Sequence, residues 1–339
     1  MAKKAAAAPK AVQSAPAPTA APSKPSTPPS PLPIAHYIPR LPLQLVAVLF
    51  CLFAAASQVI TDEDIIGPAR LIAALTLNPL GTLPLACGLL ALVQTWFGYW
   101  LRSCRTAAAK KEAGVEEDKP VKEKKGIKGS FGDMWTKALG GEAPHKTLWK
   151  RAQKKKPGDA LGGFDTRFVP QAVMVTLAAT FAFFVCAVLL GAPLFSNVTE
   201  TFLLCLFVSI LSVLPLSIAI PPLNSAQEQY TWLRLFSSLS PNDDLELALL
   251  APAVGAIAGC WSGAIPIPLD WDRPWQKWPT TCVLGALSGH MLGSIVSLAI
   301  CAYRGAVRGA ASVLQEVKEQ EQAKSTAAAG KGGRKGKAQ

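Results

Sequence analysis

The chain has 339 residues, of which 50% are hydrophobic and only 17% are charged, and its 34 Lys and Arg residues against 22 Asp and Glu give a net charge of +12. The distribution of charge excludes an ordinary soluble protein, because six long stretches contain no charged residue at all. A helix needs roughly 20 apolar residues to cross a hydrocarbon core about 30 Å thick. The sequence therefore predicts an all-α, polytopic membrane protein with six transmembrane helices, at 41–60, 71–101, 168–199, 201–227, 247–269 and 278–303.

The first 40 residues form a segment rich in Ala and Pro that contains no acidic residue. Such a segment buries too little apolar surface to offset the entropy cost of ordering it, so we expect residues 1–40 to be a disordered tail. The first apolar stretch starts only at Leu41, which is too late for a cleavable secretory signal. Residues 41–101 then supply the first two spans, and the first of them acts as its own insertion signal.

Residues 102–167 form a basic loop between the second and third spans. Nearly all Lys and Arg residues of the chain lie in this loop or in the two tails, and the opposite side of the predicted membrane has only Arg70, Arg273 and Lys277. By the positive-inside rule, the loop and both termini are cytoplasmic. The loop should attract anionic lipid headgroups, and its scattered aromatic residues fit either short helices on the membrane surface or plain disorder. Nucleic acid is not an expected partner, because the basic residues flank membrane spans.

Two features of the spans themselves carry little functional information. Seven of the eight cysteines lie inside or at the edge of a span, where they act as small apolar residues, so no disulfide framework is implied. Asn197-Val198-Thr199 is an acceptor sequence for N-glycosylation. Because the loop there is only a few residues long, we expect Asn197 to be unmodified.

The last two spans, within 168–303, carry glycine at every fourth position: Gly255, Gly259 and Gly263 in one, and Gly285, Gly289 and Gly293 in the other. Residues four apart share a helix face, and in lipid such faces allow helix backbones to approach closely. The two rows therefore predict a tight hairpin. The alternative is that one of the rows faces a partner membrane protein.

The connection inside the segment 263–279 combines proline, tryptophan and charge. Pro266 and Pro268 should end the fifth span, because proline removes a backbone donor and blocks continuation of the helix. On a helical turn, Trp271, Trp275 and Trp278 would form one aromatic face. The candidate residues of this motif are Pro266, Pro268, Asp270, Trp271, Asp272, Arg273, Pro274, Trp275, Gln276 and Trp278.

The charges of this motif permit two interpretations. An aromatic face beside Asp270 and Asp272 suits an ammonium group, and Arg273 could bind a phosphate, so the motif fits a phosphoethanolamine-bearing lipid. It fits equally a structural corner in which Arg273 locks the two aspartates in place. His290, the one ionisable group near the middle of a span, is likewise either a functional residue or a neutral, hydrogen-bonded packing residue.

The segment 304–339 is expected to be a second disordered, basic, cytoplasmic tail. It ends in Lys335-Gly336-Lys337-Ala338-Gln339, which resembles the dilysine signal that returns membrane proteins to the endoplasmic reticulum. That signal requires a cytosolic C-terminus, in agreement with the distribution of charge.

The run from Gly263 to Pro279, GAIPIPLDWDRPWQKWP, followed by Gly285 and Gly289, closely resembles the signature of the PIG-F family, phosphatidylinositol-glycan biosynthesis class F, and the chain resembles its fungal members. This resemblance implies a multi-pass endoplasmic reticulum membrane protein of glycosylphosphatidylinositol (GPI) anchor assembly. It implies as partners the large ethanolamine phosphate transferases that modify GPI mannoses, which the protein would stabilise, together with membrane lipids and the GPI precursor. The catalytic metal site would belong to the large partner.

The residues independently favour a non-catalytic role. Phosphoryl transfer of the phosphatase type needs two metal ions held by several Asp and His residues, and the non-cytoplasmic segments contain six acidic residues but no His. We therefore predict no catalytic residue, metal or other cofactor in this chain. Two alternatives remain, a lipid scramblase or transporter and a transferase that is catalytic by itself. Transporters usually have matching broken spans in both halves, whereas the paired glycines lie only in the last two spans.

Overall fold

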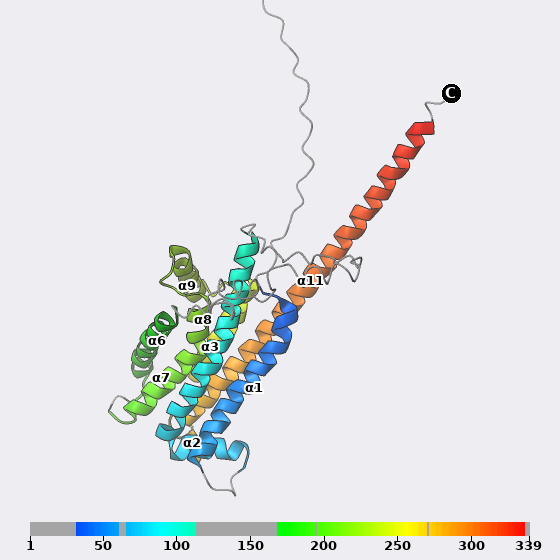
Figure 1. The fold of residues 1–339 in the computed structure, drawn as a ribbon. Coiled ribbons are helices and arrows are strands. Elements are labelled where there is room, and N and C mark those ends of the chain that lie inside the picture. The colour runs from blue at the N-terminus through cyan, green and yellow to red at the C-terminus, as the bar shows by residue number, and fades with distance from the viewer. Residues whose placement is uncertain (1–31, 61–65, 113–167, 194, 270, 336–339) are drawn as a thin grey trace, which may run out of the picture.

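The computed structural model describes residues 32–60, 66–112, 168–193, 195–269 and 271–335, and all regular elements in these ranges are helices. Most of them are arranged side by side as a bundle (Figure 1). The elements are α1 (Ile34–Val59), α2 (Pro68–Leu77), α3 (Pro79–Glu112), α6 (Val169–Leu189), α7 (Val198–Ser212), α8 (Leu214–Ala219), α9 (Ala226–Ser238), α10 (Asp244–Ser262), the 3-10 helix η2 (Pro274–Gln276) and α11 (Thr280–Lys335).

Within the described ranges, five helices are long and apolar enough to cross a membrane: α1, α3, α6, α10 and α11. The expected span at 201–227 instead forms α7 and α8, which a turn at Val213 separates. α7 has 15 residues and is about 22 Å long, which is less than the roughly 30 Å of a hydrocarbon core. Pro215 accounts for the break, because it has no N–H to donate to the carbonyl one turn earlier.

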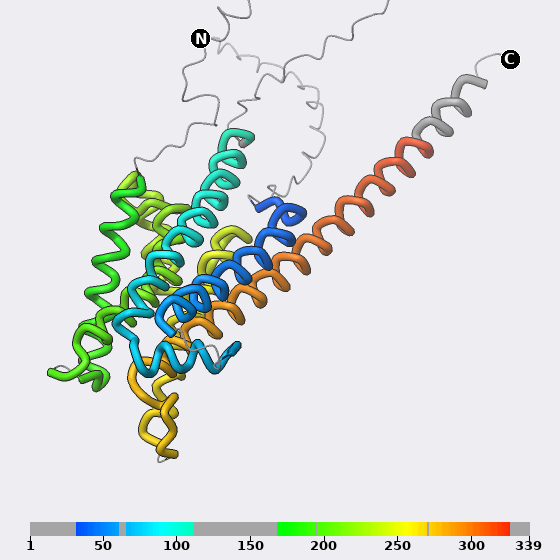
Figure 2. Tube along the Cα trace, turned by 60° about the horizontal axis from the view of Figure 1, so that its bottom comes forward, coloured from blue at the N-terminus to red at the C-terminus, as the bar shows by residue number. Residues whose placement is uncertain are grey.

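The expected span at 71–101 also consists of two helices. α2 ends at Leu77, Asn78 leaves the helical conformation with φ −140° and ψ 68°, and α3 begins at Pro79. Steric contact with a proline ring disfavours the helical region for the residue before it, so Pro79 favours a break at Asn78. As a result α2 lies across the end of the bundle, and only α3 runs along it (Figures 1 and 2).

The bundle has two ends that differ in what they contain. One end holds α2, the turn between α6 and α7, and residues 263–279, which we call the corner; we call this end the corner end (Figures 1 and 2). The opposite end, the tail end, holds α9, the C-terminal part of α3 and the long extension of α11. At the corner end, α2 contacts η2 directly.

Two helices continue into segments that the sequence predicts to be disordered. α1 begins at Ile34, before the expected boundary at Leu41, and α11 continues to Lys335. Residues 304–325 are rich in Ala, Glu, Gln and Lys, which have high intrinsic helix propensity, so the expectation of a disordered tail from residue 304 is wrong for this part. Residues 1–31 and most of the basic loop, 113–167, lie outside the described residues.

Two apolar clusters fill the bundle. The larger cluster has residues of α1, α2, α3, α6, α7, α8, α10 and α11, and the smaller one has residues of α1, α3, α8, α9, α10 and α11. The end of α7 and the whole of α8 are surrounded by other helices, because every residue from Phe207 to Pro221 is buried. α7 and α8 are therefore the centre around which the longer helices pack.

Candidate functional site

α10 and α11 pack against each other through their glycines. A methyl group on Gly259 would collide with the carbonyl group of Gly285, and one on Gly289 would collide with the carbonyl group of Gly255. The same lack of space for a side chain applies to all six glycines of the two rows: Gly255, Gly259, Gly263, Gly285, Gly289 and Gly293. The structure therefore brings the two rows into backbone contact. Small residues at a helix interface in lipid permit such close packing.

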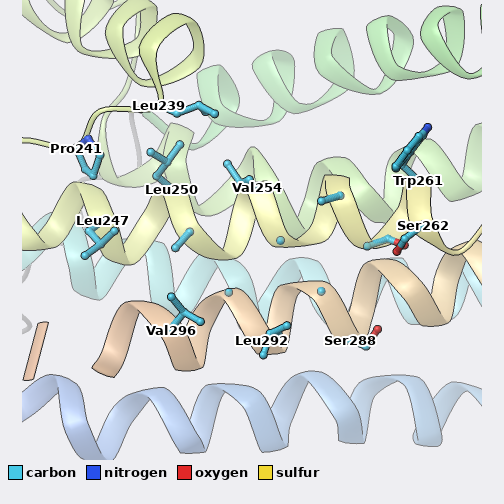
Figure 3. Close-up of a pocket in the computed structure, with 16 residues that line it drawn as sticks. Leu239, Pro241, Leu247, Leu250, Val254, Trp261, Ser262, Ser288, Leu292 and Val296 are labelled. Atoms are coloured by element: carbon cyan, nitrogen blue, oxygen red, sulfur yellow. The ribbon is translucent and has the colours of Figure 1, made fainter. Parts of the chain in front are cut away.

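An apolar groove of about 800 Å³ runs over this glycine contact, because the glycines leave no side chain to fill it. Figure 3 shows the walls of the groove. On α10 they are formed by Leu250, Val254 and Trp261, and on α11 by Ser288, Leu292 and Val296. The Trp261 side chain is 66% exposed at one end of the groove. The hairpin thus combines a rigid interior contact with a grooved, apolar outer surface.

The buried side chain of Gln276 holds the corner together. Its Nε2 donates to the carbonyl oxygens of Pro266 and Leu269, at 2.7 Å each, and its Oε1 accepts from the backbone N–H of Arg273 at 2.9 Å. These three hydrogen bonds tie the turn that follows α10 to η2. The Gln276 side chain therefore satisfies the N–H of Arg273 and adds a second hydrogen bond to two carbonyl groups that already accept a backbone N–H of the turn.

The tryptophans of the corner do not form one aromatic face, because only Pro274 to Gln276 is helical. Trp271 and Trp275 lie with ring centroids 5.9 Å apart. Trp278 instead contacts α7, where its Nε1 donates to Oγ1 of Thr201 at 3.1 Å. The corner is thereby attached to α7 as well as to its own hairpin.

The prolines of the corner follow the end of α10, and its described charged residues lie on the surface. α10 already ends at Ser262, before Pro266 and Pro268, and the turns that follow carry the chain to the corner. Asp272, which has a positive φ of 47°, and Arg273 are both exposed, and neither is in an ion pair with another described residue. Asp270 lies outside the described residues. The structure thus brings the motif into one loop, with Gln276 inside it and the described charges on its surface.

His290 lies in a buried polar cluster formed by three helices. Its Nε2 is 3.3 Å from the side-chain amide nitrogens of both Gln44 on α1 and Gln94 on α3, and these amides donate to it. Gln44 also donates to Oε1 of Gln94 at 3.4 Å. The sequence analysis did not single out Gln44 or Gln94, although each is a large amide side chain inside a stretch without charge.

Ion pairs at the tail end join α10 to its neighbours. The buried Asp244 carboxylate accepts from Arg304 at 3.4 Å and also from Arg308, both on α11. Glu246 is bound through both of its oxygens by Arg234 of α9, at 2.8 and 2.7 Å. Burial raises the pKa of the adjacent Asp243, and the nearby Glu246 carboxylate adds to this effect. These salt bridges fix the tail end of the hairpin, whereas the hydrogen bonds of Gln276 fix its corner end.

Comparison with known proteins assigns this chain to a family. The model of the GPI biosynthesis protein family Pig-F matches residues 66–298, which is more than half of the chain. The chain belongs to the Pig-F family. The match includes the corner, both glycine rows, Gln94 and His290, and thereby confirms the resemblance seen in residues 263–279. It leaves out Gln44 and the extension of α11.

Individual Pig-F relatives agree with this assignment. The human "GPI ethanolamine phosphate transferase, stabilizing subunit" is 40% identical over 121 residues, which cover 36% of this chain and 53% of the human protein. The "Glycosylphosphatidylinositol anchor biosynthesis protein 11" of Pyricularia oryzae is 34% identical over 174 residues, covering 51% of this chain and 58% of the relative. The protein of the same name from Yarrowia lipolytica is 36% identical over 146 residues, covering 43% and 60%. The chain thus spans between half and three fifths of the length of these relatives, and no solved structure matches it.

Proposed function

We propose that this Pig-F protein is a non-catalytic membrane subunit of GPI anchor biosynthesis that stabilises an ethanolamine phosphate transferase. The observation that carries the proposal is the family match over residues 66–298, together with the name of the human relative, which is a stabilizing subunit of that transferase. The partner is the large transferase, which supplies the catalytic site.

The contacts of the candidate site support a scaffolding role. The glycine rows are used for packing, the Gln276 side chain for holding the corner, and Asp244 and Glu246 for salt bridges between helices. These side chains stabilise the shape of the hairpin. A hairpin that is fixed at both ends and apolar outside is suited to present one constant surface to another membrane protein.

We further propose that the protein crosses the endoplasmic reticulum membrane six times, with α7 and α8 together forming the fourth span. Both termini and the tail end then face the cytosol, and the corner faces the lumen. The basic residues support this orientation, since Arg102 and Arg105 lie near the tail end of α3, and Arg304 and Arg308 lie on α11 at the same end. Glycosylation tags inserted at residue 130 and at residue 62 test it. A glycan on the tag at 62 alone is expected, and a glycan on the tag at 130 would contradict the orientation.

Depletion of the chain tests the stabilising role directly. When the protein is depleted, the amount of the transferase should fall while its messenger RNA is unchanged, and the two proteins should purify together. The chain purified alone should not transfer phosphoethanolamine to a mannosylated GPI. Transfer by the isolated chain would contradict the proposal and would support the catalytic alternative.

A further inference from the structure

A second cavity lies between α10 and the pair α6 and α7, next to the groove, with which it shares Leu250, Val254 and Trp261. Its volume is about 1120 Å³, and we call it the side cavity. α7 packs against both α6 and α10, so that α6 is held away from α10 by the width of the helix between them. The walls are apolar and include Phe183 of α6, Val208 of α7 and Ile257 of α10.

The dimensions of the side cavity match lipid chains better than a protein helix. It follows α10 from Leu250 to Trp261, a distance of about 16 Å at 1.5 Å per residue, and one leaflet of a bilayer core is about 15 Å thick. A transmembrane helix is about 30 Å long, which is nearly twice the length of the side cavity along α10. Phe236 and Leu239, at the end of α9, close it toward the tail end.

The side cavity extends to the corner, and two basic side chains are exposed on the corner loop. Pro268 and Trp278 line this end of the cavity, which we call its opening, and Lys277 and Arg273 are exposed on the same loop. The hydrogen bonds of Gln276 hold the backbone between these two basic residues in one conformation. Guanidinium and ammonium groups both pair with phosphate, and a fixed loop reduces the entropy cost of binding it.

We propose that the side cavity binds the acyl chains of a phospholipid from the leaflet at the corner end, and that Arg273 and Lys277 bind its phosphate. The apolar walls take the chains, and the loop at the opening takes the headgroup. The lipid then fills the space between α6 and α10 that the protein leaves open. This inference does not depend on the proposed function, because it concerns only the cavity and its opening.

Photocrosslinking of the full chain in phosphatidylcholine nanodiscs tests this lipid site. The probe is a phosphatidylethanolamine with a diazirine in one acyl chain, and a diacylglycerol with the same chains but no phosphate is the matched control. We expect the phospholipid to label the segments around Phe183, Val208 and Ile257 about tenfold more than the exposed residues Val46 and Phe50 of α1. The diacylglycerol should show no such preference. Equal labelling of both surfaces, or equal labelling by both probes, would overturn the proposal.

Variants in the cavity and at its opening separate specific binding from contact with bulk lipid. Ala187→Trp fills the side cavity from α6 and should abolish the preference, whereas Ala178→Trp on the opposite, exposed face of the same helix, outside the lining, should leave it unchanged. Arg273→Gln with Lys277→Gln changes only exposed side chains, so the fold is retained, and labelling should fall about fivefold or more. Labelling that survives in both the filled and the neutralised variant would refute the site. Loss of the lipid label on adding the transferase, with crosslinks from its helices instead, would assign the cavity to the partner.

Discussion

The two sides of α10 pack against their neighbouring helices in opposite ways. On the side of α11, glycine rows bring two backbones into contact and leave no space for even a methyl group. On the side of α6 and α7, the width of α7 separates α6 from α10 around a cavity of about 1120 Å³. In lipid, helices gain nothing by hiding apolar surface from each other, so close packing is the main source of their attraction. The comparison indicates that the α10–α11 side gives the hairpin its rigidity and that the α6–α7 side remains open to a ligand.

Substitution of a glycine at the contact should have the largest effect. Gly259→Ala and Gly289→Ala each place a methyl group against a backbone carbonyl that cannot move without shifting a helix. We expect either change to lower the free energy of unfolding by about 3 kcal/mol or more. The measurement is thermal unfolding of the detergent-solubilised protein, followed by the loss of its monodisperse size-exclusion peak.

Gly88→Ala on α3 is the matched control, because a methyl group there meets no atom within 4 Å. This change should be neutral or slightly stabilising, since alanine favours a helix over glycine. If Gly259→Ala and Gly88→Ala unfold at the same temperature, the two sides of α10 do not differ as described.

Removal of the Gln276 side chain should have the next largest effect. Gln276→Ala removes all three hydrogen bonds of this side chain, although the carbonyl groups of Pro266 and Leu269 keep the backbone N–H groups of Leu269 and Trp271 as partners. A hydrogen bond contributes about 1 kcal/mol, so we expect a total loss of about 3 kcal/mol. The same unfolding assay measures it, with the exposed Gln229→Ala of α9 as control. Equal stability of the two variants would show that Gln276 does not hold the corner.

The buried cluster of Gln44, Gln94 and His290 should contribute less. Hydrogen bonds between helices in lipid are worth about 0.6 kcal/mol on average and at most about 1.7. A double-mutant cycle of Gln94→Leu and His290→Leu should therefore give a coupling energy of about 1 kcal/mol, because Gln94 donates to His290 directly. A coupling energy of zero would mean that the cluster does not join α3 to α11.

The exposed charges of the corner should affect stability least. Asp272→Asn and Arg273→Lys alter side chains on the surface, so the free energy of unfolding should change by less than about 0.5 kcal/mol. The amount of complex with the transferase should therefore stay normal. Arg273→Lys retains the charge and loses the planar group, so reduced phosphoethanolamine transfer per complex would indicate bidentate phosphate binding. A fall in complex amount instead would show that these charges are structural after all.

Of the two sides of α10, only the close contact with α11 could be predicted from the sequence. The repeat of glycine at every fourth residue indicated a close contact, because spacing alone places residues on one helix face. The side cavity depends on how far apart α6, α7 and α10 pack, and no local pattern encodes that distance. The breaks at Asn78 and Val213 had local signals in Pro79 and Pro215, but the uncharged stretches around them concealed the change of helix.

Single polar residues were harder still to interpret from the sequence. Gln276 was one of ten candidates in the motif and attracted less attention than the tryptophans and charges around it. Its role depends on the carbonyl groups of Pro266 and Leu269, which come close only after the loop has folded. The partners of His290 lie 246 and 196 residues away along the chain, so only the tertiary structure brings them together.

The half-life of the transferase in cells that lack this chain is the most direct test of the proposed stabilising role. Pulse labelling should show that the wild-type protein and Gly88→Ala both restore the half-life, and that Gly259→Ala does not, because it disrupts the hairpin that we propose as the support of the complex. A transferase half-life that is the same with the chain, without it and with Gly259→Ala would contradict the proposal that this protein is a stabilising subunit.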